Sequence, residues 1–177
     1  MPEAIPPQQQ PQSSNLPSSP ENSQPLDEWK PYDLDFYAQE LVINNRNKKD
    51  VLTESHKMRM TVAYGLERFW GEQFRLEQQN RDKASYWKAV WKKVADILNG
   101  AGIQLPNREI RSNNPNRQQK EREEAENIRN MAEAIWRMDA DDRTIALMVL
   151  TQFCDSLVWW TQRYKKRDNN GNNQGGQ

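Results

Sequence analysis

The sequence predicts an all-α protein, a bundle of four or five helices with a disordered tail at each end. Three observations lead to this prediction: apolar residues recur at helical spacing, no stretch alternates as a strand does, and both ends of the chain are strongly polar. The chain has 177 residues, 35% of them hydrophobic and 28% charged, which suits one domain with long appendages. We therefore expect a single helical domain at residues 29–167.

The two tails are predicted from composition. Seven of the ten prolines lie in residues 1–26, among runs of Gln and Ser and with very few apolar side chains. Such a segment buries too little surface to offset the entropy lost on ordering, so residues 1–28 are expected to be disordered. Residues 168–177 are Asn- and Gly-rich, and are expected to be flexible for the same reason.

Two helices are predicted in the first part of the domain. The first is short, has Asp33 near its start, and carries the apolar residues Leu34, Phe36, Tyr37, Leu41 and Val42. The second opens at Leu52 and runs unbroken to about Leu76, with Thr53 as its cap and Glu54 in its first turn. Its apolar face comprises Met58, Val62, Leu66, Phe69 and Leu76, broadened by Trp70 and Phe74.

A third and a fourth helix follow. The third covers about Lys83–Asn99 and should stop at Gly100. A loop at residues 100–116 leads to the fourth helix, for which Asn114 is the expected cap and Pro115 the first-turn residue. The expected apolar stripe of this helix comprises Ala125, Ile128, Met131, Ala132, Ile135 and Trp136.

The most apolar window of the chain is Ile145–Tyr164, which is preceded by the acids Asp139, Asp141 and Asp142. Its apolar side chains cover most of the helix circumference, so we expect a central helix around which the others pack. A membrane span is the alternative. Polar residues such as Gln152 and Asp155 interrupt the run before it reaches about 18 apolar residues, which argues against a span.

Few residues could support catalysis or hold a metal. The chain has one Cys, Cys154, and one His, His56, which rules out a disulfide framework and a four-ligand zinc site. No glycine-rich phosphate-binding loop is present, and nothing in the spacing brings His56 to Cys154. We expect no cofactor and no enzymatic activity; a hydrolase or transferase would require a special site around His56. Lacking a basic-then-apolar leader, the chain is expected to be cytoplasmic.

Basic side chains align on two of the predicted helices. On a wheel of roughly 100° per residue, Lys57, Arg68 and Arg75 fall within roughly 20° of each other, opposite the apolar face of the second helix. A second line follows on the third helix. Such lines can follow a phosphate backbone, although solvated helix faces are also commonly basic. The predicted RNA-binding residues are Lys57, Tyr64, Arg68, Arg75, Arg81, Lys88 and Lys92.

The tryptophans indicate a protein partner as well. The chain has seven, more than a compact core of this size usually requires. Trp87, Trp91 and Trp160 fit core stripes, whereas Trp159 is a neighbour of Trp160 turned by about 100°, so one of this pair is expected to reach the rim. Exposed aromatic area on a bundle is typical of a protein interface.

Two segments carry a resemblance to a known family. Around Leu52, Thr53 and Arg59, the segment YAQELVINNRNKKDVLTESHKMRM resembles the start of the small subunits of type III CRISPR–Cas effector complexes. The last helix, FCDSLVWWTQRYKK, is similar to the final helix of that family, with a phenylalanine followed by aromatics, a tyrosine and bases. The matching positions in this helix are Phe153, Trp159, Trp160 and Tyr164. The long N-terminal tail, the Asn/Arg-rich loop and the tryptophan count depart from the family pattern.

The resemblance implies a non-catalytic subunit that contacts guide RNA paired with target RNA, other effector-complex subunits and further copies of itself. Base pairing would then supply sequence recognition, while this chain contributed phosphate contacts. Arg59 lies at the edge of the apolar arc, so we expect it, with Trp159, to serve a subunit contact. The alternative is a stand-alone helical adaptor that holds protein partners through its tryptophans and Pro-rich tail.

Overall fold

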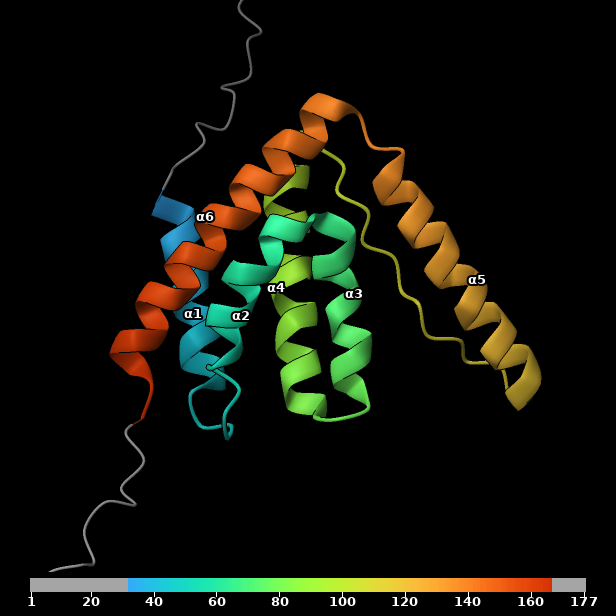
Figure 1. Cartoon of the computed structure of the whole chain (residues 1–177), viewed down its shortest axis with the longest axis horizontal. Coiled ribbons are helices and arrows are strands. Elements are labelled where there is room, and N and C mark those ends of the chain that lie inside the picture. The colour runs from blue at the N-terminus through green and yellow to red at the C-terminus, as the bar shows by residue number, and fades with distance from the viewer. Residues whose placement is uncertain (1–31, 167–177) are drawn as a thin grey trace, which may run out of the picture.

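The computed structural model describes residues 32–166, and that part of the chain is helical without strands (Figure 1). Its elements are α1 (Tyr32–Asn45), α2 (Glu54–Thr61), the 3₁₀ turn η1 (Val62–Tyr64), α3 (Leu66–Glu77), α4 (Arg81–Gly100), α5 (Arg117–Trp136) and α6 (Ala140–Tyr164). The all-α prediction is confirmed. The tails predicted at residues 1–28 and 168–177 lie outside the described residues.

The central helix is α6, which packs against α1, α2 and α4 (Figure 1). Val149, Leu150, Phe153 and Leu157 are among its buried side chains, as the sequence predicted. By length and composition α6 is also able to cross a membrane, its most apolar window having a mean hydropathy of 1.2. Core helices of bundles have the same properties. The apolar circumference expected of α6 is buried on one side only, because Ile145 and Met148 are 41% and 59% exposed.

The predicted long second helix is wrong, because the chain breaks at Gly65. There φ is +104°, a conformation that L side chains rarely adopt, and α2–η1 ends while α3 begins. The periodicity concealed the break, since Met58 and Val62 before it and Leu66 and Phe69 after it are all buried. The single helix expected here is therefore two helices, α2 and α3, and the described residues contain six α-helices rather than the five expected.

The helix caps differ in part from those predicted. The Thr53 side chain does not cap α2; its hydroxyl donates instead to the Asp50 carbonyl oxygen. The α5 cap is Asn116 rather than Asn114, and its side chain accepts from the Gln119 amide. Asp139 caps α6 by accepting from two backbone amides of the first turn, which completes the acidic start read from the sequence.

A buried carboxylate joins α2 to α4. Glu54 is fully buried and accepts from Lys57 Nζ at 2.9 Å and from Trp87 Nε1 at 3.1 Å; Lys83 Nζ lies 3.1 Å away. Burial by itself raises the pKa of Glu54, but the hydrogen bonds from Lys57, Trp87 and Lys83 outweigh it and the pKa is lowered. The sequence reading of Glu54 as a first-turn dipole residue missed this role.

A hydroxyl chain joins α2 to the two longest helices of the core. Ser55 Oγ lies 3.0 Å from the Tyr86 hydroxyl and 2.9 Å from Thr161 Oγ1, and both hydrogen bonds are buried. These contacts fix the rotation of α2 between α4 and α6. Because every partner is satisfied, the chain adds specificity to an otherwise apolar interior.

A strap at residues 101–116 connects α4 to α5 without regular secondary structure. It runs between α3 and α5, and α5 stands apart from the other helices (Figure 1). Only Met131 and Ile135 of α5 are buried, so the predicted six-residue stripe is wrong at Trp136, which is 61% exposed, and at Ile128. The position of α5 therefore depends on contacts with the strap as well as on apolar burial.

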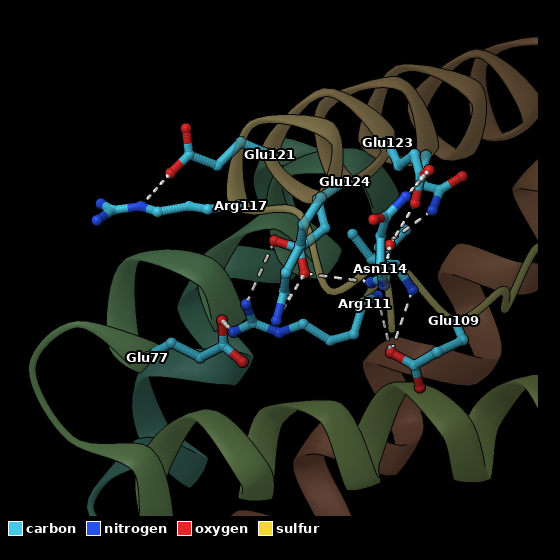
Figure 2. A network of polar contacts seen from close by, with 12 residues as sticks. Glu77, Glu109, Arg111, Asn114, Arg117, Glu121, Glu123 and Glu124 are labelled. Atoms are coloured by element: carbon cyan, nitrogen blue, oxygen red, sulfur yellow. Dashed lines mark hydrogen bonds and ion pairs between the residues drawn. The ribbon is translucent and has the colours of Figure 1, made fainter.

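A polar network attaches the strap to the helices on either side (Figure 2). The Arg111 guanidinium donates to Glu77 of α3, and its other terminal nitrogen lies 3.6 Å from Glu124 of α5. The Ser112 hydroxyl donates to Glu123, and its amide donates to Glu124 at 3.2 Å. Arg111 thus lies between acids from two helices and bridges them.

Candidate nucleic-acid interface

The basic line predicted on the second helix does not form. Gly65 separates Lys57 from Arg68 and Arg75, so one helical wheel does not describe them. Lys57 pairs with buried Glu54, and Arg75 pairs with Glu72. Arg68 lies over the Tyr64 ring at 5.7 Å, and both side chains are exposed. Of the predicted RNA-binding residues here, only Arg68 and Tyr64 remain together without an acidic partner in the described chain.

The α4 line is better preserved. Arg81, Lys88 and Lys92 are all exposed on this helix, as predicted. Arg81 and Lys88 also line a groove of about 720 Å³ between the α3–α4 hairpin and the strap with α5. Lys88, however, pairs with Glu109 at 3.0 Å, which lowers the pKa of Glu109 and offsets the positive charge. This groove is therefore only weakly positive.

The two predicted subunit-contact residues lie close together on one face. Arg59 forms an ion pair with Asp155 of α6, Nε to Oδ1 at 2.5 Å, so part of its role is internal to the chain. Trp159 is 45% exposed, and the Arg163 guanidinium covers its ring at 3.2 Å. The structure thus identifies Trp159 as the member of the tryptophan pair that reaches the surface.

A strongly basic hollow, here called the basic pocket, lies where α1 and α6 end side by side. The two helices run parallel: Gln39 Nε2, in the second half of α1, donates at 3.2 Å to the hydroxyl of Tyr164, the last residue of α6. The α1–α2 loop therefore lies beside the end of α6. The pocket has a volume of about 200 Å³ and is lined by Arg46, Asn47, Lys48, Lys49, Asp50, Leu52, Lys165 and Lys166.

The basic pocket contains five cations and a single acid, Asp50. Lys48 donates to Asn45 Oδ1 at 3.0 Å and lies 4.0 Å from Asp82. The other four cations form no ion pair within residues 32–166. Clustered cations without carboxylate partners are the arrangement that neutralises phosphates, so this hollow is a candidate anion site.

Sequence reasoning missed the basic pocket for a physical reason. Its two halves, the run at residues 46–49 and the pair Lys165–Lys166, are more than a hundred residues apart. The pair Lys165–Lys166 directly follows the last helix, where cations also complement the negative end of the helix dipole. The signal that could have found the site was the presence of two basic runs, each directly after a predicted helix.

The groups considered for catalysis stay apart from these surfaces. His56 is exposed on α2, whereas Cys154 is buried in α6, and burial raises the pKa of the Cys154 thiol far above its ordinary value. Among residues 32–166 there is no group of three or more His, Cys, Asp or Glu side chains placed to hold a metal ion. A cysteine in this environment is a packing residue.

Comparison with known proteins finds no relative: no family model, no curated protein and no solved structure matches the chain. The function therefore has to be argued from the surfaces described above.

Proposed function

We propose that this protein is a non-catalytic RNA-contacting subunit of a larger assembly, with the basic pocket as its main phosphate contact. The observation that carries the proposal is the convergence of Arg46, Lys48, Lys49, Lys165 and Lys166 on one hollow with a single acid. The net charge of the whole chain is zero, so this local excess is not a consequence of a generally basic protein. Phosphate contacts of this kind position a nucleic acid without reading its sequence.

The type of assembly comes from the sequence resemblance. In the small subunits of type III CRISPR–Cas effector complexes, which the chain resembles around Arg59 and in its last helix, the guide RNA supplies recognition and other subunits cleave. We propose the same division of work here: guide RNA and target RNA as ligands, other effector subunits as neighbours, and a cytoplasmic location. The Arg68–Tyr64 pair and Arg81 are secondary contacts for the backbone and bases.

The proposal is tested by RNA binding to charge-reversal variants. The variant Arg46→Glu/Lys49→Glu/Lys166→Glu removes three cations of the pocket that lack ion pairs, and the matched control Arg117→Glu/Arg122→Glu/Arg129→Glu makes the same charge change on exposed α5. Fluorescence anisotropy with a labelled single-stranded RNA is measured between 50 and 200 mM salt. Losing three phosphate contacts should reduce the slope of log K against log salt by about 2 and weaken binding at least about tenfold at low salt.

Equal loss in the pocket variant and the α5 control would show only non-specific attraction and would overturn the proposal. Circular dichroism of both variants checks that the helices are intact. The assembly is tested separately by purifying the tagged full chain from its native host. Recovery of short, repeat-derived guide RNAs with several larger subunits is the expected result, whereas unrelated partners without RNA would contradict it.

The second candidate is a helical adaptor that binds proteins alone. It is favoured by exposed aromatic side chains, of which Phe36 and Trp136 are each 61% exposed and Trp159 is 45% exposed. Under this function the pocket variant keeps every partner of the wild-type chain. Replacing Trp136 and Trp159 with alanine would release those partners instead.

A further inference from the structure

A groove beside the C-terminal half of α6 combines aromatic rings with carboxylates. It has a volume of about 270 Å³ and is lined by Asp35 of α1 and by Asp155, Ser156, Trp159 and Trp160 of α6. Because α1 and α6 run parallel, the acidic first turn of α1 lies against this part of α6. The groove lies near the start of α1, whereas the basic pocket lies at its end.

Trp159 and Trp160 supply the aromatic surface of this groove. The Trp159 and Trp160 rings meet edge to face with centroids 4.5 Å apart, and Trp160 stacks on Tyr164 at 5.4 Å. Trp160 Nε1 is buried and has no hydrogen-bond acceptor, alone among the buried side-chain polar atoms of the described chain. An orphaned buried donor is destabilising, so the hydrogen-bonding capacity of the aromatic cluster beside the groove is incompletely satisfied.

The charge of the groove favours a cation. Asp35 is exposed and forms no ion pair within residues 32–166, and Asp155 is engaged by Arg59 through one oxygen only, Oδ1. The structure already contains one example of the chemistry involved, because the Arg163 guanidinium lies over the Trp159 ring at 3.2 Å. Indole faces attract guanidinium and ammonium groups through the negative potential of the ring.

We propose that this groove binds an arginine or lysine side chain presented by a peptide segment of a partner protein. The cation lies against the indole rings and pairs with Asp35. The volume suits one long side chain and is below the usual range for small-molecule pockets, about 300–1,000 Å³. This deepens the proposed subunit contact at Arg59 and Trp159, and it does not depend on RNA binding.

The test is a peptide titration of the ¹⁵N-labelled full chain, followed through the tryptophan indole signals. The probes are acetyl-Gly-Gly-Arg-Gly-Gly-amide and the same peptide with neutral citrulline in place of arginine. The Trp160→Phe variant assigns the Trp160 signal. The arginine peptide should shift the Trp159 and Trp160 signals in a saturable way with a millimolar Kd, and the citrulline peptide should bind at least about fivefold more weakly, about 1 kcal/mol.

A charge variant separates a specific site from general attraction. Asp35→Asn should weaken the arginine peptide several-fold, whereas the control Asp96→Asn, an exposed acid on α4, should leave its affinity unchanged. Equal binding of arginine and citrulline peptides, or equal effects of the two variants, would overturn the proposal. Indole shifts that depend on protein concentration without peptide would show a second copy in the groove and would overturn it too. The RNA affinity of the basic-pocket variants is unaffected by any of these outcomes.

Discussion

The buried carboxylate of Glu54 gives the sharpest test of the packing between α2 and α4. In Glu54→Ala, Trp87 Nε1 loses its acceptor inside the core, and leaving such a donor unpaired costs about 1–3 kcal/mol. Lys57 is half exposed and recovers its hydration, so its lost ion pair adds about 0–1 kcal/mol, and the less exposed Lys83 adds about 1 kcal/mol. The free energy of unfolding should therefore fall by about 2–5 kcal/mol.

The assay is urea and thermal unfolding followed by circular dichroism. At about 4 °C per kcal/mol for a domain of this size, Tm should fall by about 8–20 °C. The control is Glu121→Ala, which removes an ion pair to Arg117 on the exposed face of α5 and should change stability by less than about 0.5 kcal/mol. A Glu54→Ala variant as stable as the control would refute the reasoning.

The pH dependence supplies a second readout of the same residue. The pKa of Glu54 is lowered from its ordinary 4.5, so the unfolded chain binds the proton more readily than the folded chain does. The stability that Glu54 contributes is therefore complete above pH 4.5 and is lost as the pH falls through the lower pKa of the folded state. The difference between wild type and Glu54→Gln should shrink over that range. A difference that stays constant at acid pH would show that the charge of Glu54 is unimportant.

Three further predictions follow from the described geometry. Gly65→Ala should destabilise the fold by about 1–2 kcal/mol in urea unfolding, because φ there is +104°. Gly71→Ala lies inside α3 with open space at the added Cβ, so it should stabilise the fold by about 0.5–1 kcal/mol. Equal effects of the two variants would contradict this account of the glycines. Cys154 should react with a thiol reagent at pH 8 only as fast as the chain unfolds, because the buried thiol has a raised pKa, and rapid reaction of the native chain would contradict its burial. Arg111→Ala should speed hydrogen exchange in the strap and α5 while lowering global stability by less than about 1 kcal/mol, and unchanged exchange would show that apolar contacts alone hold α5.

Local pattern was sufficient for most of the fold. The apolar pattern of α6 predicted its packing against several other helices, although Ile145 and Met148 remain exposed. The helix containing Trp87 and Trp91 was placed within about two residues. The break at Gly65 could not be read in the same way, because Gly71 stands inside a regular helix a few residues later. Glycine permits a positive φ without requiring it, and the apolar spacing continues across η1.

The candidate sites were harder to predict, because they depend on which helices lie side by side. The exposed positions of Arg81, Lys88 and Lys92 followed from the helical period alone. The helical period could not predict ion pairs to acids distant in sequence. Lys88, for example, is neutralised by Glu109 on the strap, 21 positions away. The basic pocket and the tryptophan groove both require the parallel packing of α1 on α6, which no periodicity determines.

That parallel packing also sets the character of any contact made at the basic pocket. Two helices end there together, so the partial negative charges of their last carbonyls point toward the same hollow. An anion bound by the five cations is repelled by this field, unlike one held at a helix N-terminus, where both terms attract. The contact should accordingly form and break rapidly, so that a bound nucleic-acid strand shifts its register along the protein without dissociating from it.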